Sequence, residues 1–259
     1  MTATKGVDAL GYIRCVGQAP IQPPFKAVVD ALRSAVRGPL ADLADLVDSV
    51  YLYGSVARAD AEPGRSDLDA VLLLVDAPSA HDLERIEAMR RALEQRHSEV
   101  TKVDFDLGSL GEVHAPDNLE RWGFWLKHHC RCIAGPDRTQ AFPLFRPSRA
   151  VARAVNGDFP EVLTEYARRI AGPADCAQVM PLMRQAARKA IRATNMLRPA
   201  DSSHWPDSLD DHLQQFAAAF PESIDLLCFF AAQQRQPQAD AQDFSRRLLH
   251  FVAWMQERL

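Results

Sequence analysis

The chain has 259 residues, of which 47% are hydrophobic and 25% are charged, and its formal net charge is −4. This composition is typical of a globular protein with a substantial core, and it excludes a disordered or collagen-like chain. The length suits one large domain or two of ordinary size. The slightly acidic balance gives no general reason to expect binding along a nucleic-acid backbone.

The cysteines and the amino terminus favour a cytoplasmic protein. The cysteines are odd in number and scattered, at Cys15, Cys130, Cys132, Cys176 and Cys228. A disulfide framework would be denser and its chain shorter, so we expect reduced thiols. The amino terminus lacks the apolar run of a signal peptide. Since no stretch approaches the apolar length needed to cross a bilayer, we expect no membrane partner.

Strand-like and helix-like segments alternate through the first half of the chain. Helical patterns cover 25–37, 80–97 and 117–130, and strand patterns cover 49–53, 68–75, 101–107 and 131–135. Ser79 is expected to cap the helix at 80–97 with Asp82 three residues later, and Leu83 begins its apolar stripe. The strand at 68–75 is apolar on both faces after its first residues, as in a covered central strand.

After Gly135-Pro136-Asp137 the pattern becomes helical, with no convincing strand. Helical periodicity covers segments near 147–155, 160–171, 178–198, 207–219, 222–233 and 241–258. We therefore predict an α+β protein. A mixed sheet with flanking helices would occupy residues 1–138, and an all-helical bundle domain residues 139–259.

The stretch from residue 51 to 75 carries the clearest chemistry. A strand leads into Gly54-Ser55, and a Pro-Gly turn precedes Ser66-Asp67-Leu68-Asp69 at the start of the next strand. Glycine lets a backbone approach a ligand closely, and N–H groups at a helix start attract phosphate oxygens. The Ser55 hydroxyl adds a further donor, so this turn is a candidate phosphate-binding site.

Two pairs of carboxylates follow the same spacing. Asp67 and Asp69 lie two apart on a strand and point to one face, and Asp104 and Asp106 repeat the arrangement on a later strand. Carboxylate pairs suit Mg²⁺, which also keeps substrate phosphates as ligands. A third carboxylate beside the first pair would bridge a second ion and accept a proton from an attacking hydroxyl. Alternation does not separate Asp104 from Asp106; we favour Asp104.

This segment resembles the DNA polymerase β-like nucleotidyltransferase superfamily. Its signature is a Gly-Ser turn, an Asp-x-Asp strand about a dozen residues later, and a third acid on a following strand. Here these are Gly54-Ser55, Asp67-x-Asp69 and Asp104. The whole chain is most similar to aminoglycoside adenylyltransferase-type proteins, which add a helical domain to this core. The motif match is specific over about residues 49–107 and rests on architecture beyond 137.

The resemblance implies transfer of a nucleoside monophosphate, AMP from ATP or another nucleoside triphosphate, to a hydroxyl with release of pyrophosphate. The acceptor would be a small molecule such as an aminoglycoside, or a macromolecule, nucleic acid included. Asp67, Asp69 and Asp104 would hold two Mg²⁺ ions, with Asp104 as the base. Related enzymes can place this base on a nearby glutamate, so Glu99 is an alternative.

Nucleotide contacts are expected from Gly54, Ser55, Arg58, Ser66 and Arg188. Arg58, like the neighbouring Arg65, has the alternative of a solvated loop arginine. Arg188 belongs to a basic stripe with Arg184, Lys189 and Arg192, which has no acidic residue between Met180 and Pro199. The stripe either binds the triphosphate, as the family architecture would allow, or is a solvated helix face.

Other features of the sequence point less clearly to a function. His128, His129, Cys130 and Cys132 lack the spacing of a zinc site. Trp205 is a candidate for lining an acceptor pocket. The alternative function is a regulatory module, the nucleotidyltransferase half of a toxin–antitoxin pair that acts on a protein or RNA partner.

Overall fold

The computed structural model describes residues 6–37, 43–172 and 176–259. The described residues form two compact units, one within Arg14–Phe145 and the other made of residues 6–13 together with those of Arg146–Leu259. The sequence placed the division at residue 138. In the structure, the guanidinium of Arg146 lies 4.3 Å from the ring centre of Tyr12, so the amino-terminal segment contacts the start of the helical unit.

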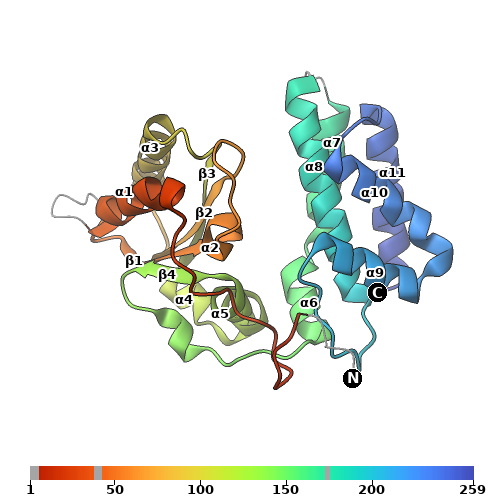
Figure 1. Ribbon diagram of the computed structural model, residues 1–259, viewed down its shortest axis with the longest axis horizontal. Coiled ribbons are helices and arrows are strands. Elements are labelled where there is room, and N and C mark those ends of the chain that lie inside the picture. Colours follow the sequence, from red (N-terminus) through yellow and green to blue (C-terminus); the bar gives the residue numbers. More distant parts are fainter. Residues whose placement is uncertain (1–5, 38–42, 173–175) are drawn as a thin grey trace. The chain divides into compact units, whose positions relative to one another are not determined.

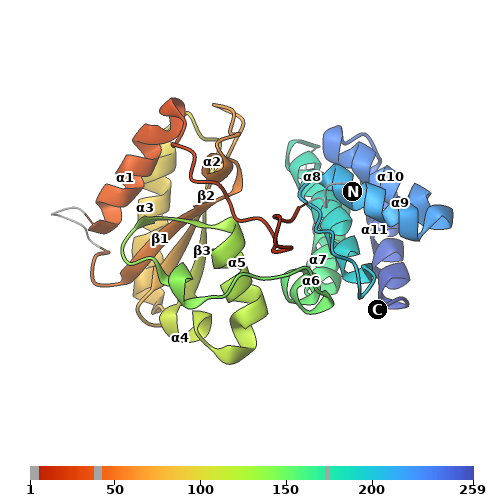
Figure 2. The same cartoon turned by 60° about the horizontal axis from the view of Figure 1, so that its bottom comes forward.

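The first unit is a sheet with helices on both faces (Figures 1 and 2). Its strands are β1 (Val47–Tyr53), β2 (Leu68–Leu74), β3 (Val103–Ser109) and β4 (Arg131–Ala134). Its α-helices are α1 (Lys26–Arg37), α2 (Gly54–Arg58), α3 (Ala80–Arg96), α4 (Leu110–Val113) and α5 (Phe124–His129). Short 3₁₀ turns lie at Pro23–Phe25, Pro116–Asn118 and Arg138–Ala141, and a π-helical turn at Leu119–Gly123.

The strand order is β3-β2-β1-β4, and the sheet is mixed, as the sequence predicts. β1 runs antiparallel to β2 and β4, whereas β2 and β3 are parallel. Alternation along β2 separates two cores. Leu68, Ala70, Leu72 and Leu74 face the core formed with α1 and α3. Val71 and Leu73 face the core that contains Trp122 and Leu126, so the odd-numbered face of β2 lies opposite α1 and α3.

The capping of α3 is confirmed: the Ser79 hydroxyl accepts from the Asp82 N–H, and the Asp82 side chain accepts from the Ser79 N–H. Other details of the first unit differ from expectation. Leu83 does not join the core, because 45% of it is exposed. Residues 101 and 102 precede β3, which extends instead to Ser109. The segment 117–130 is divided into 3₁₀, π and α turns instead of one helix.

The second unit is helical, as predicted. It contains α6 (Arg149–Asn156), α7 (Phe159–Ala171), α8 (Cys176–Ala193), α9 (Leu209–Ala219), α10 (Ile224–Arg235) and α11 (Ala241–Gln256). Two 3₁₀ turns lie at Thr194–Leu197 and Pro221–Ser223. Among the described residues, no single helix is long and apolar enough to cross a membrane. One pair, Leu209–Ala219 with Pro221–Arg235, passes that test only jointly and is bent by 120°.

The segment after β4 is fastened to β1. The guanidinium of Arg138 donates to both carboxylate oxygens of Asp48, at 3.0 and 2.6 Å. The Tyr51 hydroxyl accepts from the Arg138 N–H at 2.7 Å and donates to the Pro136 carbonyl at 3.3 Å. These contacts hold the chain that follows the last strand against β1.

Arg138→Gln should reduce the free energy of unfolding by about 1 kcal/mol at neutral pH, because the pair is partly exposed and screened. The Arg138 hydrogen bond is the first cause that lowers the pKa of Asp48. A lowered folded pKa stabilises the protein above the unfolded pKa, and this stabilisation is lost as pH falls through the folded value. Denaturant unfolding at neutral and acid pH should therefore show the difference between wild type and variant vanishing in acid. An equal difference in acid would contradict the assignment.

Candidate active site

Four carboxylates lie near one another where β1 ends and β2 and β3 begin: those of Asp67, Asp69, Asp104 and Asp106. Asp69 is the second residue of β2, and Asp104 is its register partner on β3. Val103, Phe105 and Leu107 belong to the α1–α3 core, so Asp104 and Asp106 lie on the opposite face, with Asp69. Register pairs Asp106 with Val71. Parallel pairing therefore places Asp104 level with Asp69, while Asp106 lies two residues farther along.

Negative charge at Asp69 is poorly compensated. Burial and, after it, the neighbouring charges of Asp67, Asp104 and Asp106 together raise the pKa of Asp69 to about 6, with Lys102 acting in the opposite direction. A half-buried group of carboxylates favours either a proton or a cation. The oxygen donors are those that Mg²⁺ prefers, so the residues present fit that ion.

Gly54 brings the backbone of the next turn against this group. Its φ is +69°, in the left-handed region that glycine tolerates. A Cβ at this position would lie 2.1 Å from Oδ2 of Asp69, well inside contact distance. Tyr53, the residue before it, is the register partner of Asp69 on β1. The glycine is therefore required both by the backbone conformation and by the closeness of the carboxylate.

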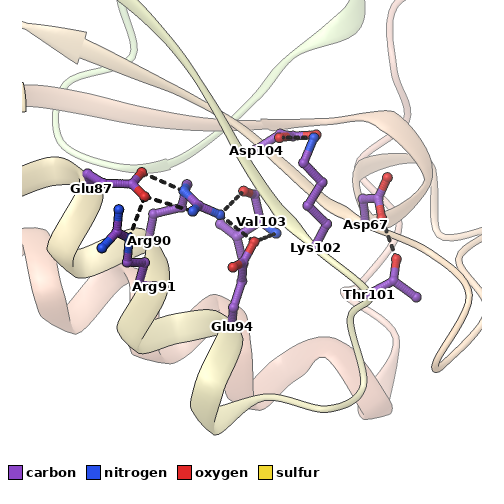
Figure 3. Close-up of polar contacts among 9 residues, drawn as sticks. All are labelled: Asp67, Glu87, Arg90, Arg91, Glu94, Thr101, Lys102, Val103 and Asp104. Atoms are coloured by element: carbon purple, nitrogen blue, oxygen red, sulfur yellow. Dashed lines mark hydrogen bonds and ion pairs between the residues drawn. The ribbon is translucent and has the colours of Figure 1, made fainter. Parts of the chain in front are cut away.

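The side chains of the flanking acids are held by residues just before β3 (Figure 3). The Thr101 hydroxyl donates to Oδ1 of Asp67. The Lys102 ammonium donates to Oδ2 of Asp104 at 2.6 Å. In this arrangement, no three acidic, histidine or cysteine side chains of the described residues converge as a ready-made cation site. An incoming ion would compete with Lys102 for Asp104.

Several predicted residues lie in the turns around the group. Ser55 is partly exposed in α2. The Ser66 hydroxyl accepts from the Glu62 N–H at 2.9 Å and so closes the Pro-Gly turn. The Arg58 guanidinium donates to Asp60 at 3.1 Å. These contacts are local, and phosphate binding by Ser55, Arg58 and Ser66 stays a prediction.

The alternative base, Glu99, and the basic stripe of α8 lie in different units of the chain. Glu99 lies in the turn before β3, outside the strand, and its carboxylate is 2.9 Å from Nδ1 of His97. Arg188 is exposed on α8, in the helical unit. Lys189, beside it, forms an ion pair with Asp158 at 2.5 Å, so part of the stripe is compensated from outside its own helix. A role of Arg188 toward the triphosphate stays a prediction.

Two residues of the site were not singled out from the sequence. Lys102 shares the polar face with Asp104, and the strict alternation of 101–107 was the available signal for their pairing. The pKa of Tyr53 is raised first by burial and then by the charge of Asp106 and a hydrogen bond with it. Its ring packs edge-on against Trp125, with centroids 5.2 Å apart. Tyr53 therefore separates the carboxylates from the apolar core around Trp125.

His128 has a structural role. Its Nε2 accepts from the Phe145 N–H at 3.0 Å, and its Nδ1 lies 3.6 Å from the sulfur of Cys15. Its ring also stacks on Phe124, with centroids 5.2 Å apart. Both ring nitrogens therefore contact other segments of the first unit.

Gly54→Ala should destabilise the fold more than Gly64→Ala. Both glycines have positive φ, +69° and +71°, so both variants incur a backbone strain of roughly 1–2 kcal/mol. A Cβ on Gly64 meets nothing within 4 Å among the described residues, whereas on Gly54 it displaces Asp69. Thermal unfolding of the two variants measures the difference. Equal losses would show that the closeness of Asp69 to Gly54 has no energetic consequence.

Asp69→Asn should stabilise the protein in the presence of a chelator. Because the folded pKa of about 6 lies above the ordinary aspartate value of 3.8, ionisation of Asp69 destabilises the fold increasingly between these values and fully above them. The difference between these two pKa values corresponds to at most about 3 kcal/mol. Unfolding measured across pH should show a gain for the variant at neutral pH that disappears in acid. A destabilised variant at neutral pH would contradict the charge argument.

Comparisons with known proteins concern the domain and the fold. Residues 34–123 match the family model of the nucleotidyltransferase domain. No curated protein matches the chain in sequence. In fold, the chain is similar to spectinomycin adenyltransferase AAD(9) from Enterococcus faecialis, solved with ATP and spectinomycin. The TM-score is 0.59 at 11% identity, over 90% of this chain and 98% of that one. The matched residues include Gly54-Ser55 and all four carboxylates, so the part of the chain that carries the candidate site is similar to a nucleotidyltransferase domain.

Proposed function

We propose that the protein transfers a nucleoside monophosphate, AMP from ATP, to a hydroxyl of a small cationic acceptor such as an aminoglycoside, with pyrophosphate as the leaving group. The observation that supports this most directly is the parallel register that sets Asp104 level with Asp69 beside the Gly54 turn. A nucleotidyltransferase domain over these residues gives the reaction class.

The carboxylates would bind the cations that neutralise the negative charge of the reacting phosphates. Asp67, Asp69 and Asp104 would hold the Mg²⁺ ions, and Asp104 would take the proton of the acceptor hydroxyl. When bound, two Mg²⁺ ions neutralise the α-phosphate and stabilise the entering and leaving oxygens. Lys102 holds the Asp104 carboxylate near the start of β3. Catalysis then rests on positioning and charge neutralisation.

The Gly54-Ser55 turn binds the β- and γ-phosphates. Its backbone lies against Asp69, so phosphate oxygens held by the turn are close to ions held by the carboxylates. Ser55 donates its hydroxyl. Arg58 exchanges Asp60 for a phosphate oxygen, which is a modest cost because the exposed pair with Asp60 is weak. Ser66 and Arg188 complete the proposed nucleotide contacts.

The fold neighbour and the net charge support the proposed acceptor class. The neighbour was solved with ATP and spectinomycin, and its fold extends over 90% of this chain. The present chain carries a net charge of −4, which suits a cationic acceptor better than a polyanion. We propose that the reaction occurs in the cytoplasm, where ATP and magnesium are available.

A substrate screen tests the proposal. Radiolabelled nucleoside triphosphates would be incubated with the protein, Mg²⁺ and, in separate reactions, aminoglycosides including spectinomycin, total protein and total RNA. Label on an aminoglycoside is the expected result. Label on a protein or RNA fraction would replace the small-molecule acceptor with a regulatory role. Absence of label from every reaction, with folded protein, would overturn the proposed transfer.

Asp67→Asn and Asp69→Asn should each reduce magnesium-dependent pyrophosphate release by more than roughly a hundredfold, since residues that only support metal ligands already cost 10- to 100-fold. Asp210→Asn is the matched control, because Asp210 is an exposed carboxylate paired with Arg235 outside the matched domain. Near-normal turnover of either site variant would disprove the ligand assignment. Asp104→Asn should be inactive and Asp106→Asn active; the reverse order would make Asp106 the base.

A further inference from the structure

The amino-terminal end of β3 is held by side chains of α3. β3 lies at one edge of the sheet, so backbone groups that face away from β2 have no strand partner. The Leu68 N–H donates to the Lys102 carbonyl at 2.8 Å, which turns the polar groups of the next residue, Val103, outward. The Val103 N–H donates to Oε1 of Glu94 at 2.9 Å, and its carbonyl accepts from Nη1 of Arg90 at 3.4 Å (Figure 3).

These two side chains are themselves fixed. Arg90 donates from Nη1 to Glu94 at 2.5 Å, and from Nε and Nη2 to the two oxygens of Glu87 at 2.7 and 2.8 Å. Arg91 donates to the same Glu87 at 2.7 Å but bonds nothing on β3 among the described contacts. Glu87 therefore orients Arg90, and Arg90 orients Glu94. Such charge-assisted, bidentate bonds restrict the rotamers of both partners.

The bonded residue stands between two residues of the site. Lys102 precedes Val103 and Asp104 follows it, and these two form the ion pair described above. Asp104 faces Asp69 only while the start of β3 keeps its register, and a slip of one residue would turn the carboxylate to the opposite face. A displacement of about 1 Å at a reacting group can cost on the order of a hundredfold in rate.

We propose that Arg90 and Glu94 are positioning residues, which act as a substitute strand at Val103 and hold Asp104 level with Asp69. This inference rests on the proposed function of Asp104. A purely structural role would tie α3 to the sheet and affect stability alone. The two roles differ in what they do to the metal-binding face.

The experiment compares Glu94→Asp with Glu94→Gln. The aspartate keeps the charge but is one methylene too short to reach Val103, whereas glutamine keeps the reach and an acceptor oxygen. Arg91→Gln is the matched control, since Arg91 pairs with Glu87 and is 67% exposed. The readouts are kcat and KM for ATP, Mn²⁺ binding by electron paramagnetic resonance without nucleotide, and hydrogen exchange of the 102–106 amides.

Glu94→Asp should lower kcat by on the order of ten- to a hundredfold, with KM for ATP nearly unchanged, as for residues that orient metal ligands. It should also weaken Mn²⁺ binding by about tenfold and accelerate exchange of the Val103 amide. Glu94→Gln should recover most of these values, and Arg91→Gln should match wild type.

A Glu94→Asp variant with lower stability but unchanged kcat and Mn²⁺ affinity would overturn the positioning role. Failure of the proposed function gives a different pattern. In that case wild-type protein releases no pyrophosphate with any acceptor, and Mn²⁺ binding and amide exchange still decide whether Glu94 positions Asp104. If Glu94→Asp does not fold, the Arg90→Lys variant, which loses the bidentate bond to Glu87, is measured in its place.

Discussion

Parallel pairing of β2 with β3 is the constraint on which the site depends. Parallel register keeps residues of equal depth side by side, so Asp69 and Asp104 stand at the same level of one face. The opposite face of the same strands is filled by the apolar core under α1 and α3, which prevents either strand from turning over. Burial of the apolar residues on one face of β2 and β3 therefore fixes Asp69 and Asp104 on the other face, although their negative charges repel each other.

The site holds interactions that are unfavourable for folding alone. Asp69 is half-buried among carboxylates, and Gly54 occupies a left-handed conformation against it. Lys102 and Thr101 offset part of this repulsion through Asp104 and Asp67. Such local conflict is typical of functional sites, where a ligand supplies what the protein lacks. Here the missing element is positive charge, which Mg²⁺ would supply in the proposed function.

Much of this arrangement follows from sequence pattern. Alternation and apolar runs predicted the four strands, and the Ser79–Asp82 box was confirmed because capping is a local interaction. The mixed sheet and helical second unit were also predicted. The division of 117–130 into three kinds of helical turn was missed, because tertiary packing overrides periodicity. Periodicity within single elements could not predict two contacts that join separate segments. These are the pairing of Lys189 with Asp158 and that of Glu94 with the Val103 backbone. The site assignments from Gly54 to Arg188 stay predictions.

The side chains that occupy the outer edge of β3 have a second effect. An uncovered edge strand offers its N–H and C=O groups to any extended chain, and such edges are common starting points for aggregation. At Val103 both groups are already bonded by Glu94 and Arg90, and the surrounding charges make the approach of another strand costly. Glu94 and Arg90, which order the start of β3, thus also hinder intermolecular strand pairing at that end.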